Sequence, residues 1–175
     1  MKKFFGGYTL IELLTNISII IILSSCVIVI NLTNEKRLNL QKSAYQITQD
    51  LRELQEKSLG GELNTQCDLF QPRYDNFGIS LKTEEDCYYI FVDCNDDKSY
   101  NNDGSEIITK ISLKKGITIK NLSPGNPLNI IFESPDPIVY INTVKWGYQE
   151  GEIILKSQDR EKTVRINSAG RIEIE

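Results

Sequence analysis

The sequence predicts an α+β protein in which one long N-terminal helix, half apolar and half amphipathic, packs on a C-terminal antiparallel β-sandwich-like domain. Three observations carry this prediction. The first is an apolar run from Tyr8 to Ile30 that contains a single charge. The second is a polar stretch that keeps a helical period. The third is a series of short β-rich segments, separated by turn residues, that fills the rest of the chain.

The apolar run has the length of a membrane-spanning helix. It contains 23 residues, and about 20 apolar residues cross a bilayer core of roughly 30 Å. Its one charge is Glu12, and a carboxylate in hydrocarbon is costly enough that it normally has a partner or a function. Lys2 and Lys3 precede the run and place the N-terminus in the cytoplasm by the positive-inside rule. We therefore expect residues 8–31 to lie in the inner membrane as a single pass, with the remainder on the outer side.

Residues 32–60 are predicted to continue the helix with one apolar side. No proline occurs before Pro72, and Gly60 and Gly61 mark the expected helix end. Glu53 and Lys57 form an i,i+4 pair in the favourable order. Apolar residues recur at spacings of 4, 3, 4 and 3, at Leu40, Ala44, Ile47, Leu51 and Leu54. This stripe is interpreted as core packing against the globular domain.

Residues 61–175 are predicted to form that β-rich domain. Nine strands are expected, at residues 77–81, 88–92, 107–113, 117–122, 128–132, 138–141, 153–156, 163–166 and 172–174. The first two should form a hairpin, because only a short polar turn separates them. Residues 124–127 and 134–137 contain two prolines each and are expected to be turns.

Composition argues against an enzyme. The chain of 175 residues has no histidine, which excludes Ser-His, Cys-His and zinc-histidine chemistry. No pair of carboxylates stands out, so no catalytic residue is assigned. The net charge of −4 disfavours a nucleic-acid binder. A structural or binding protein is the expected class.

The first residues resemble the class III signal of type IV prepilins and type II secretion pseudoprepilins. The matching features are Lys2-Lys3, Gly7, Tyr8 and the following segment Thr9-Leu10-Ile11-Glu12-Leu13-Leu14. The resemblance implies that a prepilin peptidase cuts between Gly7 and Tyr8, releases the leader 1–7 and N-methylates Tyr8. It also implies that the carboxylate of Glu12 pairs with the N-terminal amine of a neighbouring pilin or pseudopilin subunit during assembly.

The C-terminal segment resembles the end of GspH/FimT-type minor pseudopilins, whose closing hairpin carries a Gly-Arg turn. Here the turn is Gly170-Arg171, followed by Ile172 and Glu173. Some members of this family bind DNA for uptake through a Gly-Arg-x-Arg element. In this chain an acid replaces the second arginine and would repel phosphate, so Arg171 is a weak nucleic-acid candidate. The resemblance implies a minor pilin or pseudopilin, with a DNA-uptake minor pilin of the FimT kind as the alternative.

A lipoprotein is a further alternative, because Leu23-Ser24-Ser25-Cys26 resembles a lipoprotein cleavage box with Cys26 acylated. Two features count against it. Glu12 would lie inside the signal, and the apolar residues 27–30 follow Cys26 where a polar tether is expected.

Three cysteines lie on the exported side, where disulfides persist. Cys87 and Cys94 stand at opposite ends of one predicted strand and are too far apart to pair. Cys67 precedes the first strand of the hairpin, beside the end of the second. This favours Cys67–Cys94 over Cys67–Cys87, while free thiols remain the third possibility.

The segment after the second predicted strand is acidic. Asp93, Asn95 and Asp97 have the 1, 3, 5 spacing of calcium ligands. Lys98 replaces the glycine of an EF-hand loop, so a solvated turn is the favoured interpretation and no other cofactor is expected. Trp146 is interpreted either as an exposed contact residue or as core.

Overall fold

The structure, a computed structural model, describes residues 9–62, 76–101, 106–136, 138–144 and 149–175, without the side chains of residues 26–33. The chain divides into two units, Met1–Lys36 and Arg37–Glu175. The helix α1 (Leu10–Leu59) contributes its first stretch to the first unit and its second stretch to the second unit. Each unit is described by itself.

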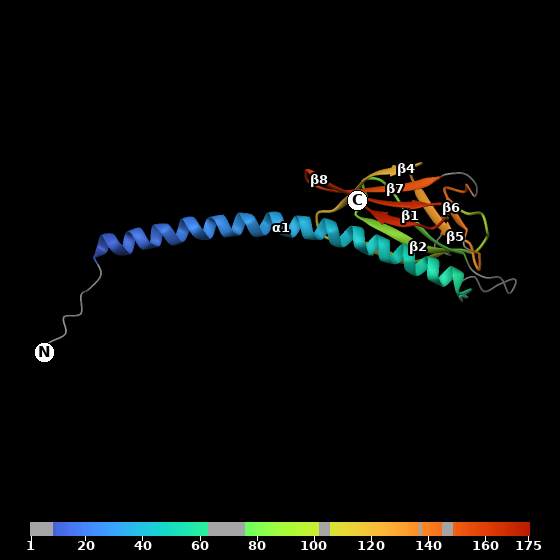
Figure 1. Ribbon diagram of the computed structural model, residues 1–175, viewed down its shortest axis with the longest axis horizontal. Coiled ribbons are helices and arrows are strands. Elements are labelled where there is room, and N and C mark those ends of the chain that lie inside the picture. The colour runs from blue at the N-terminus through green and yellow to red at the C-terminus, as the bar shows by residue number, and fades with distance from the viewer. Residues whose placement is uncertain (1–8, 63–75, 102–105, 137, 145–148) are drawn as a thin grey trace. The chain divides into compact units, whose positions relative to one another are not determined.

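Nine strands follow α1 in the described part of the chain (Figure 1). They are β1 (Asn76–Leu81), β2 (Cys87–Asp93), β3 (Ile107–Ser112), β4 (Thr118–Ser123), β5 (Leu128–Phe132), β6 (Val139–Ile141), β7 (Glu150–Ser157), β8 (Arg160–Asn167) and β9 (Ile172–Ile174). They form a five-stranded sheet in the order β3-β2-β1-β5-β6 and a four-stranded sheet in the order β4-β7-β8-β9. All neighbouring strands are antiparallel. The predicted α+β class with antiparallel sheets is confirmed at this level.

The predicted hairpin is present, with Phe77 opposite Val92 and Leu81 opposite Tyr88. The β7–β8 hairpin is longer than predicted at both ends, since the ladder runs from the Glu150–Asn167 pair to the Ser157–Arg160 pair. Its outer residues are polar apart from Gly151, so hydrophobic patterning did not reveal that they belong to the ladder. Backbone hydrogen bonds extend the strands where no apolar side chain marks them.

One core joins α1 to both sheets within the second unit. The predicted helical stripe is buried and packs in the same cluster as residues from each sheet, among them Ile79, Leu128, Ile153 and Val164. Cluster residues in both sheets alternate along their strands, as expected for sheets that bury one face against a helix or another sheet. Burial of this stripe explains why a largely polar stretch is helical here, because tertiary packing stabilises an amphipathic helix more than propensity does.

The five-stranded sheet also has a covered outer face. Phe91, Ile131 and Tyr140 form a second buried cluster there, with Tyr100 and Ile138 packed against it. The centre of this face requires a glycine: a Cβ on Gly78 would lie 2.6 Å from Cζ of Phe91 and 2.9 Å from Cγ1 of Ile131. Every residue of β1 is consequently buried.

The end of α1 confirms the predicted stop. The N–H of Glu62 donates to the carbonyl of Lys57, the N–H of Gly61 donates to that of Ser58, and Gly61 has a φ of 63°. This arrangement satisfies carbonyls that the helix end would leave unpaired. The predicted Glu53–Lys57 ion pair is present at 2.7 Å.

The turn between β8 and β9 rests on α1. Gly170 has a φ of 78°, and the side-chain amide of Gln55 donates to its carbonyl at 3.5 Å. A Cβ on Gly170 would collide with that amide. The glycine of the Gly-Arg turn is therefore explained by backbone conformation and by its contact with the helix.

Candidate functional site

The first stretch of α1 exposes an unusually apolar surface within its own unit. The exposed large side chains include the five consecutive residues 19–23, with exposed fractions of 55–63%. Five consecutive residues exceed one helical turn of 3.6 residues, so apolar groups face every direction around the axis. The remaining exposed members are Leu10, Ile11, Leu13, Leu14 and Ile17. Such a surface needs an apolar environment, either lipid or other helices.

Three hydroxyl groups on this stretch are satisfied by carbonyls of the helix itself. The hydroxyls of Thr15, Ser18 and Ser25 donate to the carbonyls of Glu12, Leu14 and Ile22 at 3.0, 2.9 and 2.7 Å. A helix that needs no water for these groups suits an apolar environment, where an unpaired polar group is costly.

Glu12 stands at the N-terminal turn of α1 and is exposed. The hydroxyl of Thr9 accepts a hydrogen bond from the backbone N–H of Glu12 at 3.3 Å and donates to its carboxylate at 3.5 Å. Thr9 is therefore the N-cap, and a carboxylate in the first turn also favours the helix dipole. Sequence reasoning missed this cap, although Thr9-x-x-Glu12 has the spacing of a capping box.

The other processing residues lie outside the described residues. This applies to Gly7 and Tyr8, which flank the predicted cut, and to the side chain of Cys26. Within the residues that the structure does describe, no helix has both the length and the hydropathy that crossing a membrane requires.

The structure describes the bonding state of two cysteines, Cys87 and Cys94. Cys94 is disulfide-bonded, while its predicted partner Cys67 lies outside the described residues. Cys87 is a free, buried thiol, so the alternative pairing of Cys67 with Cys87 is not formed. Burial raises the pKa of this thiol, and hydrogen bonding to the carboxylate of Glu85 adds to the effect. A thiol that is buried and protonated reacts slowly.

The acidic segment after β2 is organised by hydrogen bonds to its own backbone. The carboxylate of Asp93 accepts the N–H groups of Asp97 and Lys98, each at 3.1 Å, and is buried. The side-chain oxygen of Asn95 accepts the N–H of Asp97 at 3.1 Å. The predicted calcium ligands thus cap a turn, and the described residues hold no group of three His, Cys, Asp or Glu side chains suited to a metal. Calcium binding stays a sequence prediction.

The two aspartates differ electrostatically. Burial raises the pKa of Asp93, although its hydrogen bond with the backbone of Lys98 acts in the opposite direction. Asp97 experiences some desolvation, but hydrogen bonds from Asn101 and Ser99 leave its pKa below the ordinary value. Asp93 therefore stabilises the turn from a buried position, whereas Asp97 lies at the surface, where its charged form is favoured.

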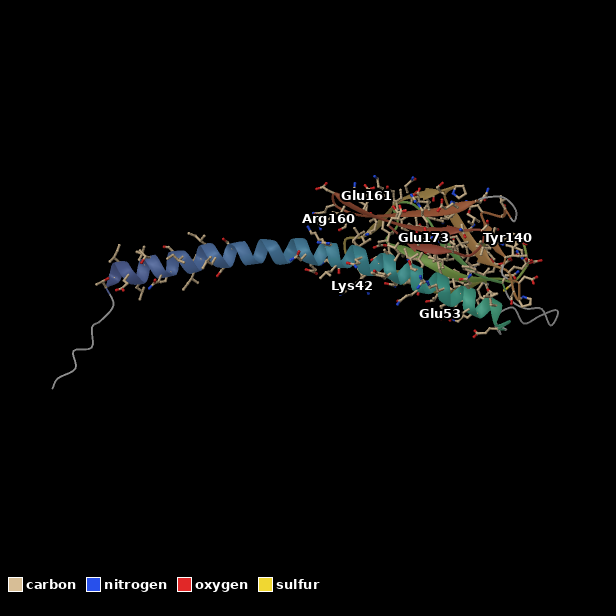
Figure 2. All side chains as sticks on the ribbon, in the orientation of Figure 1. Lys42, Glu53, Tyr140, Arg160, Glu161 and Glu173 are labelled. Carbon is tan, nitrogen blue, oxygen red and sulfur yellow. The ribbon has the colours of Figure 1, made fainter. Side chains whose placement is uncertain are left out.

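This segment folds over the outer face of the five-stranded sheet. The ring of Tyr100 stacks on Tyr89 at 5.6 Å between centroids, and the ammonium of Lys98 lies 5.0 Å from the centre of the Tyr140 ring. Lys98 also pairs with Asp96 and, at 3.8 Å, with Glu133. Tyr140 is labelled on this part of the unit in Figure 2. No pattern in the sequence pointed to this covering layer, because its contacts join residues distant in the chain.

Two buried polar atoms beside this layer have no hydrogen-bond partner among the described residues. They are the hydroxyl of Ser80 and the side-chain carbonyl oxygen of Asn129, whose residues face each other across β1 and β5. Such atoms lower stability, because they lose hydration without regaining a bond.

Arg171 is exposed, and its guanidinium pairs with the carboxylate of Glu173. The acid that replaces the second arginine of the family element thus neutralises the first. This geometry does not favour a phosphate contact. Trp146 lies outside the described residues.

Comparison with known proteins gives no further constraint. No protein-family model, curated protein or solved structure matches this chain.

Proposed function

We propose that this chain is a structural subunit, a minor pilin or pseudopilin, that assembles through the first stretch of α1 into a type IV pilus or a type II secretion pseudopilus. One observation carries the proposal. Between Leu10 and Leu23 apolar side chains are exposed around the whole helix, and Glu12 is the single charge among them. A globular protein would bury such a surface in its own core, so this one is suited to lipid before assembly and to neighbouring helices afterwards.

The proposed assembly site is the N-terminal turn of α1. After cleavage behind Gly7, Tyr8 would provide the new amine, and Glu12 would be the fifth residue of the mature chain. The carboxylate of Glu12 is exposed and its hydrogen bond to Thr9 is long, at 3.5 Å. It is therefore available to pair with the amine of a neighbouring subunit, an interaction that an apolar environment strengthens.

The proposed pilin-like fold combines α1 with the two sheets, which pack on its second stretch. The buried stripe on α1, the antiparallel sheets and the Gly170 turn against the helix support this interpretation. In this proposal the β-rich unit determines which partners the subunit binds, and the first stretch of α1 mediates incorporation of the subunit into the filament.

Mass spectrometry of the mature N-terminus tests the proposal directly. A chain that begins at an N-methylated Tyr8 is expected. A chain that begins at an acylated Cys26 would establish the lipoprotein alternative and exclude assembly through this helix.

Three variants separate the charge of Glu12 from its place in the helix cap. Glu12→Ala and Glu12→Gln are both expected to insert into the membrane and to fail in filament incorporation, because both remove the carboxylate. Glutamine is a good capping-box residue at this position, so it is the matched control for helix formation. Thr9→Ala should cost about 1 kcal/mol of helix stability and still be incorporated. Incorporation of Glu12→Gln at the wild-type level would show that capping is the role of Glu12.

A further inference from the structure

The start of the folded unit carries a group of exposed cations from two elements, here called the basic collar. It consists of Arg37 and Lys42 on α1 and of Lys114 and Lys115 in the loop between β3 and β4. All four residues are exposed. Figure 2 labels Lys42 on this part of α1, toward the start of the packed stretch of the helix.

The loop is held against the helix. The backbone N–H of Lys114 donates to the hydroxyl of Ser43 at 3.1 Å, and the side-chain amide of Asn39 donates to the carbonyl of Lys115 at 3.5 Å. Leu113 and Ile117, on either side of the loop, are buried in the same core cluster as Leu40 and Ala44 of the helix. The four cations are thus fixed on one end of the unit by core packing.

The collar is not neutralised within the described residues. None of its four cations lies within ion-pair distance of a described carboxylate, whereas Lys57, Lys98, Arg165 and Arg171 each have an acidic partner. The β1–β2 turn lies beside the loop and has more acids than bases. It therefore adds no net positive charge, and the positive charge here belongs to the four collar residues. This turn carries Lys82, Glu84, Glu85 and Asp86, and its backbone bonds to Leu113 and Ile119.

Charge has the opposite sign farther along the helix. Glu53 and Glu56 are exposed on α1, about 24 Å and about 29 Å beyond Arg37 at 1.5 Å per residue. The end of α1 contacts the end of β5, since the hydroxyl of Ser58 donates to the carbonyl of Phe132. Exposed Asp96 and Asp136 follow on the loops at that end. The unit thus carries the four cations of the collar at one end and exposed acids at the other, although the whole chain has a net charge of −4.

We propose that the basic collar binds anionic phospholipid headgroups of the membrane in which the apolar stretch of the same helix resides. The inference rests on the proposed function, because the collar begins shortly after that stretch along the chain. Along the chain, Arg37 follows Ile30, the last residue of the apolar run, by seven positions. Lysine and arginine next to an apolar helix are attracted by anionic lipid, and the attraction fades within a Debye length of about 10 Å at 0.1 M salt.

The collar would hold the folded unit on the outer leaflet before assembly. Repulsion of the acidic end would orient the unit with its far loops away from the membrane. Extraction into a filament would then break these headgroup contacts, so a weak, salt-sensitive interaction suits the task better than a tight one.

The experiment uses the full chain, one copy per lipid nanodisc, with amine-reactive acetylation read by mass spectrometry. Neutral phosphatidylcholine discs are compared with discs that contain about 30% phosphatidylglycerol, a typical anionic lipid. We expect acetylation of Lys42, Lys114 and Lys115 to slow about threefold or more in the anionic discs and to recover at high salt. Lys57, at the far end of α1, serves as an internal control with an unchanged rate.

A pair of double variants sharpens the result. Lys114→Gln/Lys115→Gln is expected to abolish the anionic-lipid protection of Lys42. Arg52→Gln/Lys57→Gln removes the same amount of charge from the far part of α1 and should leave that protection intact. Equal acetylation of the collar in both kinds of disc would overturn the inference. If the chain fails to enter discs of either kind, the proposed function fails as well, so the two failures are distinguishable.

Discussion

At the scale of single residues, the contact between Asp50 and Tyr88 predicts how the stability of the fold depends on the charge of one carboxylate. The hydroxyl of Tyr88 donates to the carboxylate of Asp50 and thereby joins α1 to β2. Desolvation raises the pKa of Asp50 above 3.8, although the hydrogen bond from Tyr88 lowers it. Burial and the same carboxylate raise the pKa of Tyr88. A polar pair is thus kept at the edge of the core with its carboxylate partly desolvated.

The sign of the pH dependence follows from this direction. Because the folded-state pKa of Asp50 is raised, its stabilising contribution is present below the unfolded value and is lost as pH rises through the folded value. Asp50→Asn keeps an acceptor for Tyr88 and removes the charge. We expect its free energy of unfolding to rise relative to that of the wild type as pH increases above about 4, measured by urea unfolding. Tyr88→Phe, which leaves the carboxylate unpaired, should cost about 1–3 kcal/mol. If the free energy of unfolding of the wild type instead rose relative to that of Asp50→Asn over that range, this account would be contradicted.

Gly78 provides a second prediction at this scale. Gly78→Ala should destabilise the chain by about 1–3 kcal/mol, since its Cβ overlaps Phe91 and Ile131 and the packed face has little room to relax. Ser80→Ala is the matched control on the same strand and face. It removes a buried hydroxyl that has no partner in the described part of the chain, so we expect no loss of stability. Thermal unfolding compares the two, and equal losses would show that this face is not tightly packed.

At the scale of elements, the second stretch of α1 was predictable because its period is strong. The spacing of its apolar residues identified the buried stripe, and two glycines identified its end. The strands were located by their β-branched and aromatic residues, but the ends of β7 and β8 were missed where polar residues continue the ladder. Patterning reveals which side chains are buried, and it is silent about backbone pairing at the surface.

The helix stripe supports a prediction with an internal control. Ile47→Ala removes a fully buried side chain from the centre of the core and should cost about 2–5 kcal/mol. Tyr45→Ala, two residues earlier on the exposed side of the same helix, should change the free energy of unfolding by only about 0.5 kcal/mol. Denaturant unfolding of both variants checks this, and a small effect of Ile47→Ala would mean that α1 does not hold the sheets together.

At the scale of the whole molecule, the disulfide at Cys94 connects the segment before β1 to the end of β2 if Cys67 is its partner, as predicted. Cys94→Ser should then lower the free energy of unfolding by about 2–4 kcal/mol. Cys87→Ser should change it much less, because this thiol is free. Peptide mapping of the unreduced chain identifies the partner. Recovery of Cys94 linked to Cys26 would refute the predicted pairing.

The sequence by itself determined the α+β class, the antiparallel hairpin, the buried stripe on α1 and the apolar, singly charged stretch on which the proposed function rests. These properties depend on periodicity and composition, which are local. Only the tertiary structure decided that Tyr100 and Lys98 cover a second face of a sheet, that Arg171 is neutralised by Glu173, and that four separate cations form one collar. Each of these contacts joins residues that are distant in the chain or two positions apart. Packing and strand register across the whole unit bring such residues together.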